Sequence, residues 1–124
     1  MKGRIAPALA AALVAMAGAA SVAPAQQQEQ QSGPAGDPRA GRRLAGGQCA
    51  ACHGNDGIAV LPEAPNLAGQ KAGYVSAQLQ HYRSGERKHE LMTVVSQGLT
   101  DDQIADLAAW YEAIEVTATV PGRR

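Results

Sequence analysis

Aromatic side chains are scarce in this sequence. Its 124 residues include no phenylalanine, and the aromatics that remain are one tryptophan and three tyrosines. The part that reads as a folded domain, residues 37–116, is so short that its core is marginal without disulfides, a metal or a cofactor. Only two cysteines are present. We therefore expect a bound group to supply part of the apolar core.

The sequence also lacks a persuasive membrane span. Its most apolar run, residues 5–20, is rich in alanine and falls short of the roughly twenty strongly apolar residues that a span needs. This run follows two positive charges, Lys2 and Arg4, and precedes the small residues Ala23-Pro24-Ala25. That order is typical of an export signal. We expect cleavage after Ala25, so that residues 1–25 form a signal peptide; an uncleaved anchor is the alternative.

Excess charge of one sign is a third absence. The sequence has 11 basic and 11 acidic residues, and removal of Lys2 and Arg4 leaves 9 against 11. A mature chain so close to neutral does not suggest binding to nucleic acid, which favours a basic face, or strong attraction to an anionic membrane. Residues 26–36 are rich in glutamine and have no apolar period, and we expect them to form a disordered leader.

Against these absences stands one cluster of reactive side chains, Cys49-Ala50-Ala51-Cys52-His53. It places two thiols and one imidazole on about one helical turn, as covalent attachment of a c-type haem requires. Each thiol adds to one vinyl group of the porphyrin, and the histidine faces the iron. The alternatives are a redox disulfide, which would follow a strand, and half of a zinc site. The zinc site needs a second ligand pair, for which only His81 and His89 remain.

Four helices are expected in the folded part, and no strand pattern competes with them. They cover residues 38–45, 73–83, 91–97 and 100–114. The first begins with Asp37 as N-cap and Pro38 in its first turn, and the pair Gly46-Gly47 should end it. The last begins with a capping box from Thr100 to Gln103. Residues between the first and second helices contain glycine and proline without a usable period, which predicts an irregular loop.

The first and last expected helices offer one further contact. Gly41 allows another helix to approach closely, and Trp110 needs room. We expect these two residues to meet where the helices cross. That contact would be structural.

With these blocks in this order, the chain resembles the small class I c-type cytochromes of bacteria. The similarity is to the single-haem periplasmic kind and to one domain of the two-haem periplasmic carriers. The matching residues are 49–54, 65–70, 74, 78–79, 85–87, 92 and 99–111. The resemblance implies an all-α class I cytochrome c fold, with about four short helices around one haem c attached through Cys49 and Cys52. Residues 37–116 would be the cytochrome domain, and 117–124 a flexible C-terminal tail.

The resemblance also implies a methionine ligand on the face of the iron opposite His53. Met1 and Met16 leave with the signal peptide, so elimination reaches the same residue, Met92. Alternatively, Met92 does not bind the iron and only fills space in the core, as a flexible methionine side chain often does. His81, His89 or an open site could instead take the position. We expect His53 and Met92 to bind the iron.

Further residues are expected around the haem. By resemblance, the Pro65 carbonyl accepts the Nδ1 hydrogen of His53, which would orient the ring; alternatively, Pro65 only stiffens its loop. Tyr74, Gln78 and Arg87 are candidates to reach the haem propionates or rim. For Gln78 and Arg87, a solvated surface position is the alternative.

The two ligands decide the expected function. With His53 and Met92 bound, substrate would find no vacant position on the iron, so we expect an electron carrier and not an enzyme. The expected protein is periplasmic and exchanges electrons with redox partner proteins, without nucleic acid and without stable membrane insertion after signal removal. One alternative is a haem-bearing subunit of a larger periplasmic oxidoreductase. Another is a haem sensor or peroxidase-like enzyme with an open iron site.

Overall fold

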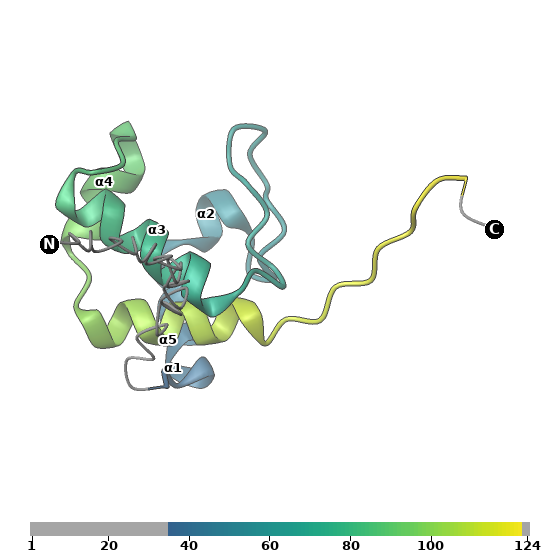
Figure 1. The fold of residues 1–124 in the computed structure, drawn as a ribbon, viewed down its shortest axis with the longest axis horizontal. Coiled ribbons are helices and arrows are strands. Elements are labelled where there is room, and N and C mark those ends of the chain that lie inside the picture. The colour runs from purple at the N-terminus through teal and green to yellow at the C-terminus, as the bar shows by residue number, and fades with distance from the viewer. Residues whose placement is uncertain (1–34, 123–124) are drawn as a thin grey trace, which may run out of the picture.

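A computed structural model describes residues 35–122, which contain five α-helices and no strand (Figure 1). These are α1 (Pro38–Gln48), α2 (Ala50–His53), α3 (Ala72–Ser84), α4 (Glu90–Gln97) and α5 (Asp101–Glu112). The all-α prediction is confirmed. Helix α2 is short and was not among the four predicted helices; it consists of the last four residues of the predicted haem-attachment motif. The expected signal peptide, residues 1–25, lies outside the described residues, as does the expected leader up to residue 34. Within residues 35–122, no helix has the length and apolarity that crossing a membrane requires.

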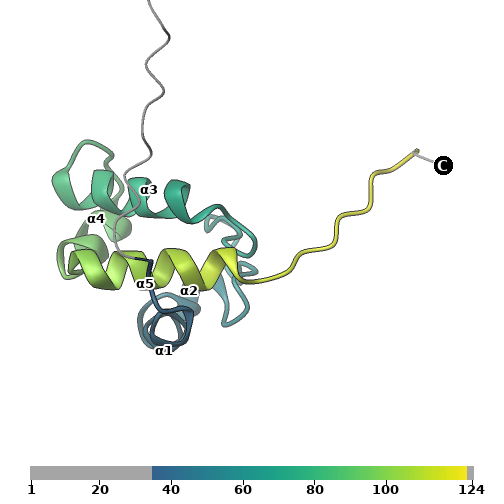
Figure 2. The same cartoon turned by 60° about the horizontal axis from the view of Figure 1, so that its bottom comes forward.

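The crossing of α1 and α5 is the most extensive contact between two helices. Figure 2 looks down α1 while α5 lies across the view. A Cβ atom on Gly41 would lie 2.0 Å from the carbonyl oxygen of Asp106 and 2.8 Å from Cβ of Trp110. The predicted contact between Gly41 and Trp110 is therefore confirmed. Gly36, which the sequence places at the end of the leader, also approaches α5: its Cβ would lie 2.1 Å from the Ala105 carbonyl oxygen.

The prediction that Gly46-Gly47 ends the first helix is wrong. Helix α1 begins as predicted, at the Asp37 N-cap, but it continues through both glycines to Gln48. Each glycine costs a helix about 1 kcal/mol relative to alanine. Ala45, directly before the glycines, is only 2% exposed in the core, and its carbonyl accepts the Cys49 N–H at 2.8 Å. Packing of α1 on α5 outweighs the local preference, so the helix leads directly into the attachment motif.

The other three predicted helices agree with the structure within one or two residues. Helix α3 ends at Gly85, which is in the left-handed conformation at φ 81°. Helix α5 starts with the complete capping box of Thr100 and Gln103. Arg83 ties these two helices together, because its Nη1 donates to the Leu99 carbonyl at 3.0 Å and its Nη2 contacts Asp101.

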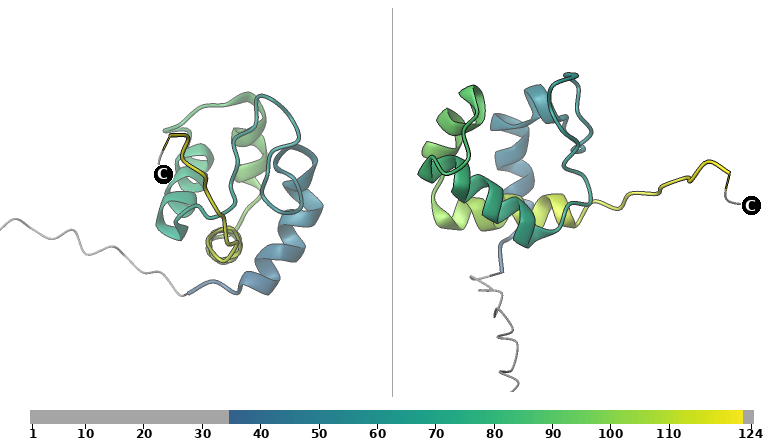
Figure 3. Two further views of the ribbon diagram at one scale, coloured as in Figure 1. Left: turned by 90° about the vertical axis from the view of Figure 1, so that its right-hand side faces the viewer. Right: turned by 45° about the horizontal axis from the view of Figure 1, so that its top comes forward.

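The core lies where α1, α3 and α5 meet. Its buried residues are Ala45, Val75, Leu79, Tyr82, Leu99, Ile104, Leu107, Ala108 and Tyr111. In Figure 1 and in the right-hand view of Figure 3, α4 stands on one side of the molecule and the 54–71 loop on the other, with α3 and α5 beneath them. Residues of both α4 and the 54–71 loop line the cavity that forms the site.

Candidate haem-binding site

A large cavity lies beside the core. Its volume is about 940 Å³, and α2, α3, α4, α5 and the 54–71 loop all contribute to its wall. All eight residues that the sequence suggested for the site line it: Cys49, Cys52, His53, Pro65, Tyr74, Gln78, Arg87 and Met92. Most of the other lining residues are apolar. The shortage of large apolar side chains in the sequence is thus accompanied by a cavity in the structure, and its volume is typical of cofactor-binding sites.

The attachment motif lies at the junction of α1 and α2. Cys49 joins the two helices, and its carbonyl accepts the His53 N–H at 2.9 Å, which closes one helical turn. This turn brings both sulfur atoms and the imidazole to the cavity wall. His53 is 6% exposed. The motif follows a helix directly, and not the strand that a thioredoxin-like disulfide would need.

The ring of His53 is held by the loop that follows it. Its Nδ1 lies 2.8 Å from the Pro65 carbonyl oxygen, and since a carbonyl can only accept, Nδ1 carries the proton. The hydrogen bond that the resemblance implied is therefore present. The loop is itself braced, because the Gly57 carbonyl accepts the N–H groups of Leu67 at 2.7 Å and Ala68 at 3.1 Å. With Nδ1 protonated, Nε2 keeps its lone pair free to bind a metal.

Helix α4 brings Met92 to the cavity, where it is half-buried against the core. Its two histidine rivals lie in different places. His81 does not line the cavity, and its Nε2 is 3.5 Å from the carboxylate of Glu86. His89 does line it, but its Nδ1 accepts the Met92 N–H at 3.3 Å as the N-cap of α4. Met92 and His89 therefore reach the cavity together, and His81 remains outside.

Arg87 is fixed at the cavity wall by two neighbours. Its Nη1 donates to Oε1 of Gln78 at 2.7 Å, and its guanidinium lies 4.7 Å from the ring centroid of Tyr82. The charge is thus held by a hydrogen bond and a cation–π contact. Tyr74, another predicted residue, lines the same cavity and is 53% exposed. These polar groups can serve the propionates of a haem.

Tyr111 is a site residue that the sequence analysis missed. It lines the cavity, and its hydroxyl is buried without a hydrogen-bond partner. The Cys49 thiol lies beside it, and burial raises the pKa of both groups. The available signal was that Tyr111 carries the only hydroxyl in the apolar stripe of α5, which comprises Ile104, Leu107, Ala108, Tyr111 and Ile114. An unpartnered buried hydroxyl at this wall fits a site completed by a bound group.

The residues present fit a c-type haem better than zinc. Two thiols, an imidazole with a free Nε2 and a mostly apolar wall surround one cavity. In the described part of the chain, no group of three or more His, Cys, Asp and Glu side chains could hold a metal ion. The second ligand pair that the zinc alternative requires is therefore not found in residues 35–122.

Comparison with known proteins agrees with this geometry. The sequence pattern of the cytochrome c family matches residues 38–113. Cytochrome c-554(548) of Halomonas halodenitrificans is 48% identical over 84 residues, which cover 65% of this chain and 100% of that protein. Cytochrome c4 of Thiocapsa roseopersicina is 45% identical over 76 residues, 61% of this chain and 39% of that protein.

A solved structure extends the comparison to three dimensions. The cytochrome c4 of Acidithiobacillus ferrooxidans superposes with a TM-score of 0.58 and 30% identity, over 62% of this chain and 49% of that chain. The chain thus spans the whole of one relative and less than half of each cytochrome c4. Sequence, cavity and comparisons agree that the chain belongs to the cytochrome c family, as a class I c-type cytochrome that transfers electrons and carries one haem c attached through Cys49 and Cys52.

Proposed function

We propose that this cytochrome carries single electrons between redox proteins of the bacterial periplasm, with His53 and Met92 as its two iron ligands. The observation that carries the proposal is the position of Met92. It lies on the cavity wall contributed by α4, while His53 lies on the part of the wall contributed by α2. The haem supplies the one-electron couple when it is bound. Two protein ligands leave no vacant position for a substrate, which favours a carrier over an enzyme.

Each ligand brings a different property to the site. The Pro65 carbonyl orients the His53 ring and makes Nε2 a better donor, because the shared Nδ1 proton increases electron density on the ring. The Met92 thioether is a soft ligand that favours the reduced state and raises the reduction potential. Buried residues make part of the cavity wall apolar, which penalises the additional charge of the oxidised state. These residues are Val75, Leu79, Leu99 and Leu107.

The proposal includes three further polar residues of the wall, Tyr74, Gln78 and Arg87. In this proposal Arg87, held by Gln78, neutralises a haem propionate, and Tyr74 donates a hydrogen bond at the rim. These contacts would fix the orientation of the haem in the cavity. They would also lower the cost of holding carboxylate groups next to an apolar wall.

The periplasmic location rests on the proposed signal peptide, residues 1–25, because bacterial haem attachment of this type is completed outside the cytoplasmic membrane. The proposed organisation continues with a leader at 26–36, a cytochrome domain at 37–116 and a tail at 117–124. The relative from Halomonas halodenitrificans supports a single-domain carrier, since its whole length aligns with 65% of this chain.

The test is an optical spectrum of the exported protein, oxidised and reduced, with carbon monoxide added to the reduced sample. We expect low-spin c-type bands, a weak long-wavelength band from sulfur bound to oxidised iron, and no reaction with carbon monoxide. Met92→Ala should abolish the weak band, admit carbon monoxide and lower the reduction potential. Val95→Ala, which shortens another cavity residue of α4, is the matched control and should keep the band. An unchanged spectrum and potential in Met92→Ala would exclude Met92 as the ligand.

A further inference from the structure

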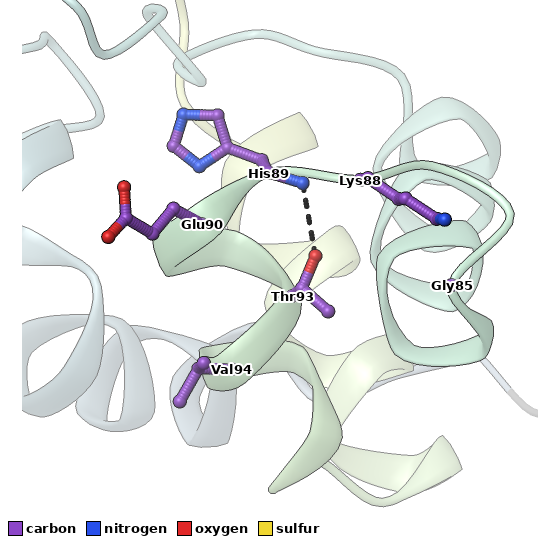
Figure 4. Close-up of a pocket in the computed structure, with 6 residues that line it drawn as sticks. All are labelled: Gly85, Lys88, His89, Glu90, Thr93 and Val94. Atoms are coloured by element: carbon purple, nitrogen blue, oxygen red, sulfur yellow. Dashed lines mark hydrogen bonds between the residues drawn. The ribbon is translucent and has the colours of Figure 1, made fainter.

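The helix that carries Met92 is capped by a histidine. The backbone of His89 is extended, with φ −157° and ψ 133°, and its Nδ1 accepts the backbone N–H of Met92 at 3.3 Å. In return, the His89 N–H donates to Oγ1 of Thr93 at 3.1 Å (Figure 4). These bonds run in opposite directions, as in a capping box, and together they close the first turn of α4. In one of these two hydrogen bonds, the donor is the backbone N–H of Met92 itself.

Helix α4 has little else to hold its first turn. It has eight residues, and isolated helices shorter than about 12–15 residues are marginal in water. Its principal helix contact is with α3. Leu91 is 61% exposed and Val94 is 69% exposed, and Ser96 near the end of the helix is its only fully buried residue. The first turn therefore depends strongly on its cap.

The cap is connected to the packed part of the protein through its ring. The imidazole of His89 meets the ring of Tyr82 edge-on, with 6.4 Å between centroids, and Tyr82 is buried on α3. The His89 ring thus contacts α3 through Tyr82, and its Nδ1 is hydrogen-bonded to the Met92 backbone. This chain of contacts links the α4 side of the cavity to the core.

We infer that His89 is a positioning residue, which keeps the Met92 thioether in the cavity by capping α4 through Nδ1. The inference rests on the proposed role of Met92 as an iron ligand. Loss of the Nδ1 acceptor leaves the Met92 N–H without its partner and loosens the turn that carries the side chain. Met92 then detaches from the iron more often, although both proposed ligands, His53 and Met92, are still present.

Exogenous imidazole can measure this detachment in the oxidised, haem-loaded protein. Imidazole takes the iron position only while Met92 is away, so its apparent affinity is proportional to the detached fraction. Loss of an N-cap usually costs a helix about 1 kcal/mol, which corresponds to about a fivefold change in an equilibrium constant. We therefore expect His89→Ala to raise the detached fraction of Met92, and with it the apparent imidazole affinity, about fivefold. His89→Asn should return the affinity to within about twofold of the parent protein, because asparagine is among the best N-caps.

A matched control separates this role from general stability. Thr100→Ala removes the N-cap of α5, a helix that does not carry Met92. It should lower the free energy of unfolding and leave imidazole affinity unchanged. If Thr100→Ala raised the affinity as much as His89→Ala, or if His89→Ala had no effect, the inference would be overturned. Failure of His89→Asn to restore the parent affinity would also overturn it.

The same titration distinguishes this inference from the proposed ligation. If Met92 is the ligand, Met92→Ala must bind imidazole far more tightly than the parent protein. Equal affinity in those two proteins would refute the ligation, whatever the His89 variants do. Tight binding by Met92→Ala together with parent affinity in His89→Ala would refute the capping role alone.

Discussion

Gly41→Ala should force α1 and α5 apart. The new Cβ would lie 2.0 Å from the Asp106 carbonyl oxygen, a backbone atom of the neighbouring helix. No rotation of a side chain can relieve such an overlap, so the helices must separate by on the order of 1 Å to restore normal contact. Gly47 lies on the same helix and provides a matched control. Apart from its chain neighbours and the backbone of its own helix, no atom lies within 4 Å of the Cβ position at Gly47.

The two substitutions should change the free energy of unfolding in opposite directions. Extra atoms in a packed contact usually cost about 1–3 kcal/mol. We expect about 3 kcal/mol at Gly41, at the upper end, because the clash is with backbone in the most extensive helix contact. Gly47→Ala should instead stabilise the protein by about 0.5–1 kcal/mol, because alanine favours the helix. For a domain of this size, the Gly41 loss corresponds to a fall in Tm of roughly 12–24 °C.

Urea unfolding of the haem-loaded variants measures both changes. Far-ultraviolet circular dichroism follows the helices, and Soret absorption follows the haem environment; linear extrapolation to water gives the free energy of unfolding. If Gly41→Ala and Gly47→Ala agreed within about 0.5 kcal/mol, the close approach of α1 to α5 would not be required for stability.

Three further substitutions probe the cavity and its supports. Cys49→Ala together with Cys52→Ala should let haem leave on denaturing extraction, and haem that stayed attached would refute covalent binding through these thiols. Tyr111→Phe should lower the free energy of unfolding of the haem-loaded protein by about 1 kcal/mol, because the bound group gives the buried hydroxyl a hydrogen-bond partner. Tyr82→Phe is the control. A higher free energy of unfolding in Tyr111→Phe would show that the hydroxyl stays unpartnered. Arg83→Lys should cost about 1 kcal/mol in a urea titration, because an ammonium group cannot reproduce the forked contact with a carbonyl and a carboxylate; an unchanged unfolding midpoint would contradict this.

Much of the site could be predicted because its chemistry is local. Residues Cys49 to His53 span one helical turn, so their relative positions depend on helix geometry and not on the rest of the fold. The helix boundaries at Asp37, Thr100 and Gly85 were also predictable, since a cap acts on backbone groups within three or four residues of itself. The family resemblance supplied the longer-range pairing of His53 with Pro65, which no local pattern contains.

Other features could not be read from local pattern. Tyr111 looks like one more residue of an apolar stripe until the fold places its hydroxyl beside Cys49. His89 looks like a rival iron ligand until the start of α4 uses its Nδ1 as a cap. In both cases, the role depends on which atoms become neighbours after folding.

By itself, the sequence determined the covalent chemistry, the all-α class and most of the helix ends, because each of these depends on residues close together in the chain. Only the tertiary structure decided that α1 continues through Gly46-Gly47, that Gly41 meets the Asp106 backbone and that α4 and the 54–71 loop enclose one cavity. The physical reason is that packing between distant segments contributes several kcal/mol per contact region, whereas local conformational preferences are about 1 kcal/mol or less per residue. Where the two conflict, packing prevails.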